Sequence, residues 1–426
     1  MRLAERLSSQ GHRVIKINFT AGDSVYSGRH VTTYAFRQPL GELDAFVQEL
    51  WTRHAITDQV VFGDCRPVHR RVIERARHRG IRNHVFEEGY FRPFWVTLER
   101  EGVNNHSLLP RDPAWYRDVA KGLPLHARPK RFANQFSIRA LHDVLYHLAG
   151  LSHPLSYPRY RTHAPVSAPV EYLGYLARFA HMPHWKRRDA RRIETLLASH
   201  RPFYLFPLQL NGDAQIRHHA GIGDMRQAIA HVMRSFAHHA PSDAVLVVKN
   251  HPLDMGLVDY ARHIRRLSRE YDLQGRVVYL ESGNLEAILE HAAGTVTVNS
   301  TVGNVALRLG CPTLALADPI YRLAGLTHPG GLDGFWQAPT PPDRQLFQAF
   351  HRTVIHAAQI NGGFYCRQGI RLAADNAARL LAADLSPLER LLCQTHPAPV
   401  AMSSSPGQPA PSAVRSPVAM RRMGSS

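Results

Sequence analysis

The feature that most constrains this chain is an alternation of short apolar segments with amphipathic segments, which occurs in two separate stretches. The first stretch predicts strands at residues 14–19, 59–62 and 84–86, and helices at residues 43–54 and 69–79. Strands that alternate with helices, with loops at the strand carboxyl ends, are typical of a parallel, doubly wound sheet. We therefore expect an α/β unit over residues 1–110.

The same alternation resumes after a long interval. It predicts strands at residues 203–207, 244–248, 277–280, 295–298 and 313–316, and helices at residues 224–237, 260–271, 285–292 and 302–309. The interval, residues 111–198, is rich in His, Arg, Tyr and Pro and predicts a mostly helical, basic insertion. Two doubly wound units, 1–110 and 199–385, that face each other across a cleft form the α/β architecture called GT-B.

Composition restricts the setting of the protein. The 426 residues suffice for two buried cores, and no stretch of about 20 apolar residues occurs. The charged N-terminus does not resemble a secretory signal, so we expect a cytoplasmic protein that does not span the membrane. The four cysteines form no CxxC pair, which makes disulfides and a structural zinc ion improbable. Residues 397–426 are rich in Pro, Ser and Ala and are expected to form a disordered tail.

The formal net charge of +18 is the strongest compositional deviation. Basic residues cluster at 128–131, at Arg159 and Arg161, and at 186–192. This excess suits nucleic acid, an anionic membrane or a phosphorylated substrate, or it is a solvated, arginine-rich surface. No helix-turn-helix, zinc-finger or RNP-type pattern favours nucleic acid. Charge alone leaves the partner open.

Four polar motifs each follow a predicted strand, which is where ligands bind in open α/β sheets. They are Glu87-Glu88-Gly89-Tyr90, Gln209-x-x-x-Asp213-x-Gln215, Lys249-Asn250-His251-Pro252 and Asn299-Ser300-Thr301-Val302-Gly303. Adjacent carboxylates supply a general acid/base, and an isolated aspartate among amides supplies a nucleophile or a sugar-hydroxyl ligand. Lysine and histidine neutralise a leaving phosphate, and hydroxyls at a helix N-terminus bind an anion.

Each motif also has a structural alternative. The glutamates can be solvated loop residues, Asp213 can stabilise an Asx turn, Lys249 and His251 can lie in a solvated turn, and Ser300 and Thr301 can cap a helix. No single motif decides between the two interpretations. The occurrence of all four, each after a predicted strand, favours a functional site.

These motifs carry a family resemblance. The segments FGDCRPVH (62–69), FEEGYFRPFWVTLEREGVN (86–104), LQLNGDAQI (208–216), KNHP (249–252) and VNSTVGN (298–304) resemble capsule polysaccharide synthesis proteins of the KpsS type. The similarity extends over about residues 1–380, and the motif layout also resembles bacterial sialyltransferases that use CMP-sugars.

The resemblance implies a retaining β-Kdo transferase of capsule biosynthesis. Such enzymes transfer Kdo from CMP-Kdo to a phosphatidylglycerol-type lipid at the inner face of the cytoplasmic membrane. The implied partners are the nucleotide-sugar donor, the anionic phospholipid, the membrane surface and other capsule synthesis and export proteins, with no nucleic acid. No resident cofactor is expected, because CMP-Kdo is a substrate.

The resulting hypothesis gives each motif a role. Asp213 is the nucleophile, and Glu88 is the acid/base, with Glu87 as the alternative carboxylate. Lys249, His251, Ser300, Thr301 and Gln209 bind the donor, and Arg92 is assigned to the Kdo carboxylate. No DxD-type motif stands at a strand end, so we expect a metal-independent site.

Three other classes of function remain open at this stage. A non-catalytic capsule assembly or export factor would share the fold and tolerate loss of Asp213 and Glu88. A nucleic-acid-binding protein would explain the charge but leave the motifs at 87–90 and 249–252 without a role. A UDP-sugar transferase or epimerase would share the GT-B architecture without requiring that pair of motifs.

Overall fold

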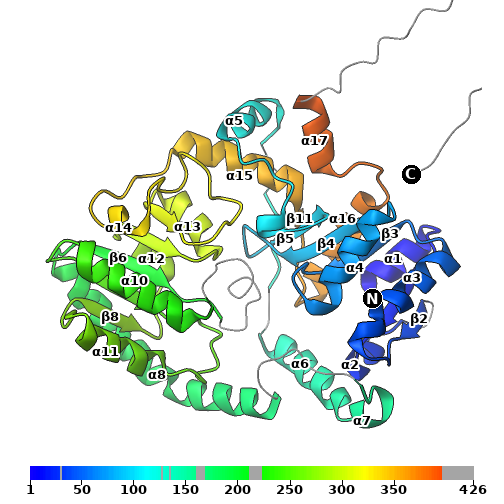
Figure 1. Ribbon diagram of the computed structural model, residues 1–426, viewed down its shortest axis with the longest axis horizontal. Helices are drawn as coiled ribbons and strands as arrows, with labels where there is room; N and C mark the ends of the chain where they lie inside the picture. Colours follow the sequence, from blue (N-terminus) through cyan, green and yellow to red (C-terminus); the bar gives the residue numbers. More distant parts are fainter. Residues whose placement is uncertain (29–30, 126–127, 134–135, 160–167, 211–222, 396–426) are drawn as a thin grey trace, which may run out of the picture.

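The computed structural model describes residues 1–28, 31–125, 128–133, 136–159, 168–210 and 223–395. These residues form two α/β halves that lie side by side and are joined by helical segments (Figure 1). Asp213 and the predicted tail, residues 397–426, lie outside the described residues. In the described part of the chain, no helix is both long enough and apolar enough to cross a membrane.

The second half contains a five-stranded parallel sheet. Its strands are β6 (Phe203–Pro207), β7 (Val245–Lys249), β8 (Val277–Leu280), β9 (Gly294–Thr297) and β10 (Thr313–Ala315). Their spatial order is β10-β9-β6-β7-β8, and every neighbouring pair is parallel. Along the chain, β7 and β8 are added on one side of β6, and β9 and β10 are then added on its other side. The connection therefore changes direction between β6 and β9, and such sheets bind ligands at the carboxyl ends of the strands at this switch point.

Side-chain alternation along the strands gives this sheet two buried faces. Tyr204 and Phe206 of β6 point into one cluster, and Phe203 and Leu205 point into the other. The first face is covered by α10 (Met225–His239), α11 (Tyr260–Glu270) and α14 (Leu332–Phe335). The opposite face is covered by α12 (Leu285–Leu289), α13 (Val302–Leu309) and the end of α8 (Ala168–Ala198).

The sheet of the first half is mixed, which corrects the expectation of a parallel sheet there. It contains β3 (Asp58–Phe62), β4 (Arg82–Glu88), β5 (Trp95–Arg100) and β11 (Gln359–Asn361), in the order β11-β5-β4-β3. Only β3 and β4 are parallel, whereas β5 is antiparallel to β4 and to β11. The short connection 89–94 forces this direction, because parallel neighbours need a crossover of about a dozen residues or more.

A separate parallel pair, β1 (Ile15–Asn18) and β2 (Thr32–Ala35), completes the strands of this half. The helices that accompany these strands are α1 (Arg2–Ser9), α2 (Ala21–Val25), α3 (Leu43–His54) and α4 (Pro67–His78), with 3₁₀ turns at Leu40–Glu42 and Asn104–His106. Ile17 and Phe36 pack with α3 and α4 in one apolar cluster.

Most of the described residues between the two halves are helical. This segment contains α5 (Pro113–Gly122), α6 (Phe136–Gly150), α7 (His153–Ser156) and α8. The α/β, GT-B-like class of the fold is confirmed: each of the two halves combines a sheet with helices, and the halves lie side by side.

The end of the chain crosses back to the first half. After α15 (Arg344–Ala358), the chain forms β11 on the first sheet, then α16 (Arg367–Leu381) and α17 (Pro387–Thr395). Figure 1 shows α15 spanning the junction and α16 beside the first sheet. The expected C-terminal unit, residues 199–385, therefore includes a segment that folds with residues 1–110.

Candidate active site

Two of the predicted motifs meet at the switch point of the second sheet. Gln209, which follows β6, donates from Nε2 to Asn299 Oδ1 at 2.7 Å, and the Asn299 backbone N–H donates to Gln209 Oε1 at 3.1 Å. Asn299 follows β9, so this reciprocal pair crosses from one side of the switch point to the other. Gln209 thus fixes the loop that carries Ser300 and Thr301.

The loop with Ser300 and Thr301 leads directly into α13. Ser300 Oγ accepts the Val302 backbone N–H at 3.2 Å, whereas Thr301, the N-cap residue of α13, makes no side-chain capping bond among the described residues. The hydroxyl of Tyr321 donates to the Ser300 carbonyl at 2.6 Å. A Cβ at Gly303 would lie 2.3 Å from the Tyr321 ring, so a glycine is required there. The Gly303 and Asn304 backbone N–H groups donate to the Ser300 and Thr301 carbonyls, so it is the positive end of the helix dipole that favours an anion here.

Lys249 and His251 lie at the carboxyl end of the neighbouring strand β7. The Lys249 carbonyl accepts the Leu208 backbone N–H at 2.8 Å, which joins this motif to the strand end before Gln209. Lys249 is buried, and burial together with the charge of Arg178 lowers the pKa of its ammonium group. An anionic ligand bound at this edge would stabilise the charged ammonium group, because an opposite charge nearby favours the ionised form.

His251 is neutral in this arrangement, which changes the role expected for it. Burial first, and then the charges of Arg92, Lys249 and Arg178, lower the pKa of His251 to about 4. The Leu253 backbone N–H donates to Nδ1 at 3.1 Å, so the ring proton resides on Nε2. His251 therefore offers a hydrogen-bond donor to a phosphate, whereas the sequence interpretation treated it as a cation.

Arg178, a residue that the sequence analysis missed, lies buried behind this motif. It pairs with Glu281 at 2.8 Å and lies 3.9 Å from Asp254, and its guanidinium stacks on Trp185 with 5.3 Å to the ring centroid. Its Nε atom has no hydrogen-bond partner among the described residues. Arg178 belongs to α8, so the helical insertion contributes a buried cation beside the strand ends.

The first sheet presents Glu87 and Glu88 at the end of β4. Glu88 accepts a hydrogen bond from the Tyr365 hydroxyl, and its Oε2 lies 3.9 Å from Arg92 Nε. Glu87 accepts the Glu88 backbone N–H at 2.9 Å and lies against Gly63, where a Cβ would be 3.3 Å from its Oε2. Because neighbouring residues of a strand point to opposite faces, the two carboxylates have different surroundings. Glu88 is the carboxylate that lies beside Arg92.

Direct interactions connect the two sheets. Asn304 of α13 donates from Nδ2 to the Tyr90 carbonyl at 3.1 Å, which links the motif after β9 to the motif after β4. Arg92 is near enough to His251 to lower the pKa of its imidazole. The structure therefore brings Glu88 and Arg92 of the first half toward His251 and the start of α13 in the second half. Asp213 lies outside the described residues, so its position in this arrangement is a prediction.

A buried polar network supports the loop that follows β4. The Tyr90 hydroxyl donates to Glu99 Oε1 at 2.6 Å and accepts the Asn104 backbone N–H at 2.7 Å, and Ser107 donates to the other Glu99 oxygen. Burial raises the pKa of Glu99 to about 7. Gln359 of β11 accepts the Tyr90 backbone N–H at 3.0 Å. Tyr90 is thus held by residues from three separate parts of the chain.

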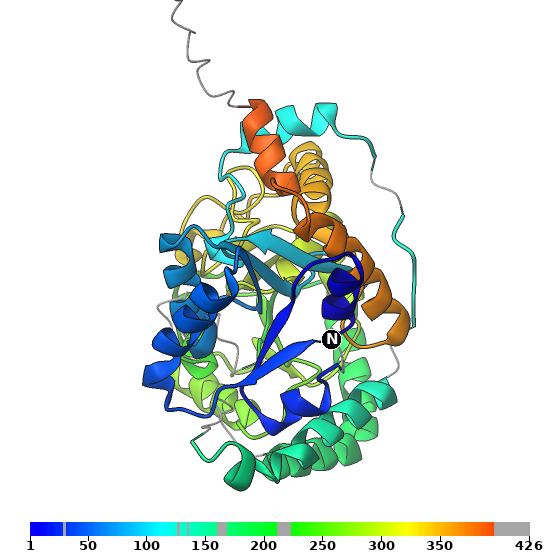
Figure 2. The same cartoon turned by 90° about the vertical axis from the view of Figure 1, so that its right-hand side faces the viewer.

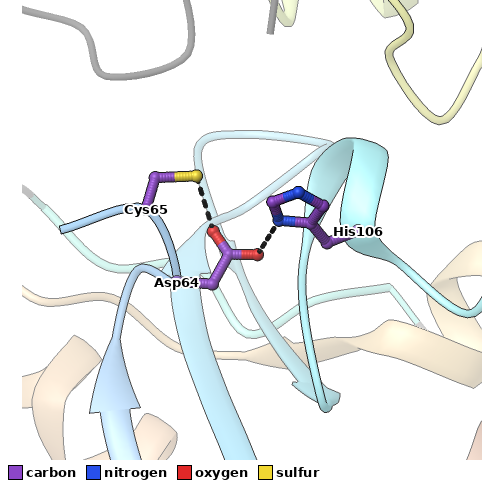
Figure 3. A group of neighbouring side chains, drawn as sticks. All are labelled: Asp64, Cys65 and His106. Atoms are coloured by element: carbon purple, nitrogen blue, oxygen red, sulfur yellow. Dashed lines mark hydrogen bonds and ion pairs between the residues drawn. The ribbon is translucent and has the colours of Figure 1, made fainter. Parts of the chain in front are cut away.

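Asp64, Cys65 and His106 form a group of possible metal ligands near this network (Figure 3). The Cys65 thiol donates to Asp64 Oδ1 at 3.1 Å, and His106 Nδ1 lies 3.0 Å from Asp64 Oδ2, which also accepts the Val103 backbone N–H. Burial and the Asp64 charge raise the pKa of Cys65, and the thiolate is the form that binds metals. The contacts describe a carboxylate that is hydrogen-bonded from three sides. Metal independence stays a prediction.

Comparison with known proteins places the chain in a family. Residues 57–365 match the family described as capsule polysaccharide biosynthesis protein. The capsule polysaccharide modification protein LipB of Neisseria meningitidis serogroup B is 35% identical over 372 residues, which are 86% of this chain and 88% of LipB. The capsule polysaccharide export protein KpsS of Escherichia coli is 35% identical over 85% of this chain and 93% of its own length.

The fold and the site thus define a GT-B-like α/β protein with its polar motifs at the facing strand ends. The chain belongs to the capsule polysaccharide biosynthesis family, and the resemblance to proteins of the KpsS type is confirmed. Among solved structures, the β-Kdo 2,7 transferase KpsC of Thermosulfurimonas dismutans is 15% identical, with a TM-score of 0.39, over 79% of this chain and 89% of that chain.

Proposed function

We propose that this protein is a glycosyltransferase that moves β-Kdo from CMP-Kdo to a phosphatidylglycerol-type lipid acceptor in capsule biosynthesis. The observation that carries the proposal is the convergence of polar motifs from both halves, which the hydrogen bond between Asn304 and Tyr90 joins. The motif resemblance supports the choice of CMP-Kdo, and membership in the capsule family supports the pathway.

The donor phosphate would lie at the edge of the second sheet. Lys249, the Nε2–H of His251, Ser300, Thr301 and the N-terminus of α13 can neutralise it as the bond to the ketosidic carbon breaks. These groups need no metal ion for that task. Arg92 is assigned to the Kdo carboxylate.

Retention of configuration implies two displacements or a front-side attack, and we assign two displacements because the motifs supply two carboxylates, Asp213 and Glu88. In the first, an Asp213 carboxylate oxygen bonds to the ketosidic carbon while CMP departs with the electrons of the broken C–O bond. In the second, the acceptor hydroxyl attacks that carbon, its proton passes to Glu88, and Asp213 leaves as a carboxylate. The Tyr365 hydroxyl donates to Glu88 and Arg92 lies beside it, so both contacts hold this carboxylate in place at the end of β4.

The direct test is incubation of the full-length protein with CMP-Kdo, phosphatidylglycerol and detergent. We expect release of CMP and a lipid that is heavier by one Kdo residue, with at most a few-fold loss of rate in EDTA. A protein that releases no CMP above a boiled control would be a non-catalytic assembly or export factor. A strict requirement for Mg²⁺ or Mn²⁺ would contradict the metal-independent site.

A further inference from the structure

A cavity lies apart from the site described above, at the carboxyl ends of β1 and β2. Its volume is about 800 Å³, and its walls come from the β1–β2 pair with α2 on one side and from α6 and α7 on the other. Asn18 and Ala35, the last residues of β1 and β2, both line it. In α/β folds this edge is the usual place for a ligand.

Two polar side chains that line the cavity, those of Asn18 and Arg37, are suited to bind a ligand. Asn18 is only 3% exposed, and its amide nitrogen donates to Ser27 Oγ at 3.0 Å, but its Oδ1 has no partner among the described residues. Buried amide oxygens normally accept a hydrogen bond, so this Oδ1 is an acceptor whose capacity the described residues leave unused. Arg37 lines the same cavity with its guanidinium over the Tyr157 ring, 5.9 Å from the centroid. The cavity therefore suits a ligand with a hydroxyl and a negative charge.

The mouth of the cavity is continuous with an exposed apolar surface. Leu141, Leu145 and Leu148 follow one another at helical spacing on α6 and are 57%, 42% and 54% exposed. Leu148 and Leu151 also line the cavity, and Leu151 is 78% exposed. Soluble proteins rarely expose such a contiguous row, so it marks a contact with an apolar partner.

The first half of α8 carries a second group of exposed apolar side chains. Leu173, Leu176 and Phe179 are each more than half exposed. The Tyr172 hydroxyl of α8 donates to Asp143 Oδ2 of α6 at 2.9 Å, which holds the two helices together. Figures 1 and 2 both show α6, α7 and α8 along one edge of the molecule.

Positive charge accompanies the apolar residues. Lys186, Arg187 and Arg191 are exposed on α8, and Arg159 follows α7. Apolar side chains flanked by arginine and lysine are the composition of helices that lie in the interface of an anionic membrane. Charge complementarity selects this partner over a second copy of the chain, because two surfaces of net positive charge repel each other.

We propose that α6–α8 lie on an anionic membrane and that the cavity takes the headgroup of a glycerophospholipid from it, with Asn18 binding a headgroup hydroxyl and Arg37 its phosphate. The inference rests on the proposed function for the class of lipid, and it adds a headgroup contact that lies apart from the catalytic carboxylates. It also adds an apolar contribution to a membrane association that the sequence attributes to charge alone.

The test is sedimentation of the full-length protein with vesicles, without any sugar donor. Wild type is expected to bind vesicles that contain phosphatidylglycerol, and some binding is expected to persist at high salt. Leu141→Ser with Leu145→Ser should lower the affinity about tenfold or more. The matched control is Leu108→Ser with Leu385→Ser, two leucines that are each 44% exposed elsewhere. Equal binding by the two double variants would overturn the membrane contact.

The cavity is tested by two further variants. Arg37→Gln should weaken binding to phosphatidylglycerol vesicles about fivefold, which corresponds to one interfacial arginine, while Arg265→Gln on α11 should not. Ala149→Trp places an indole in the cavity and should abolish competition by glycerol 3-phosphate without loss of the salt-resistant binding. If glycerol 3-phosphate fails to compete with wild type, the cavity does not bind a headgroup.

The remaining outcomes are equally decisive. If the leucine variant changes the oligomeric state and leaves vesicle binding intact, the surface contacts a second copy and the inference is wrong. Vesicle binding as expected, without CMP release in the transferase assay, would contradict the proposed function alone. If the protein releases CMP but does not bind vesicles, the inference is wrong and the proposed function is not affected.

Discussion

At the scale of single residues, Asp213 and Glu88 are assigned to different steps of the reaction. Replacing each of them should therefore block a different step. Asp213→Ala should abolish Kdo transfer while CMP still binds, because Lys249, His251 and Ser300 remain. Glu88→Gln should allow a Kdo adduct to form but slow its passage to the acceptor about 10²-fold or more. Intact-protein mass spectrometry after exposure to CMP-Kdo would detect the trapped species.

Two controls make this pair of variants informative. Asp243→Ala changes an exposed aspartate of the same half and should leave turnover unchanged. Glu87→Gln removes the carboxylate that lies against Gly63 and should slow transfer less than Glu88→Gln. Near-normal turnover in Asp213→Ala would return Asp213 to the structural role of a turn residue.

Glu99 should give the protein a pH-dependent stability. Burial raises its pKa in the folded state from 4.5 to about 7, so the folded protein retains a proton that the unfolded chain has lost. The free energy of unfolding from this group therefore falls as the pH rises from 4.5 to 7, and is constant above 7. Glu99→Gln should remove that slope in urea unfolding measured between pH 5 and 8. A slope equal to that of wild type would show that Glu99 is ionised when folded.

Residue roles were predictable from the sequence only where a motif lies at a strand end. Glu88, Lys249 and His251 follow apolar segments, and the position after a strand is visible without a structure. Arg178 and Tyr365 have no such signal, because their partners Glu281 and Glu88 are distant in the chain. The neutral state of His251 depends on burial and on Arg92, which only the three-dimensional arrangement provides.

At the scale of elements, the hairpin β4–β5 depends on Gly89. A Cβ at this position would lie 2.0 Å from the Trp95 carbonyl oxygen, so Gly89→Ala must separate the two strands. We expect a loss of about 2–3 kcal/mol in the free energy of unfolding, measured by urea titration. Gly122→Ala is the control, since a Cβ there meets nothing within 4 Å at the end of α5. If Gly89→Ala lowers the free energy of unfolding no more than Gly122→Ala does, within experimental error, the hairpin accommodates the added methyl group.

Most elements were predictable because their apolar periodicity is local. The strands β6 and β8 and the helices α3 and α13 have the bounds that the sequence indicates. The strand β5 was missed because its residues, WVTLER, include two charged side chains that are paired only in the fold. Glu99 meets Tyr90 and Ser107, and Arg100 lies 3.9 Å from Glu389 of α17.

At the scale of the whole molecule, the sequence predicted two α/β halves but not the path of the chain between them. The pairing of β11 with β5 joins residues that are about 260 positions apart, and three residues of an edge strand carry no distinctive pattern. Ile360, Ala373, Ala377 and Leu381 share one apolar cluster with Phe86, Val96 and Leu98. The first half therefore completes its core only after the second half has been synthesised.

This connection predicts an asymmetric effect of truncation. A chain that ends at Ala358 lacks β11 and α16, so the first half loses part of its core, the Gln359 bond to Tyr90 and the Tyr365 bond to Glu88. The two clusters that enclose the second sheet contain no residue beyond Trp336 and stay complete. Limited trypsin digestion should therefore cut the first half rapidly and spare residues 223–340, and CMP should still bind through Lys249, His251 and Ser300. A chain that ends at Thr395 keeps β11, α16 and α17 and should resist trypsin throughout both halves. Equal resistance of residues 1–110 in the two truncated chains would show that the first half folds without the returning segment.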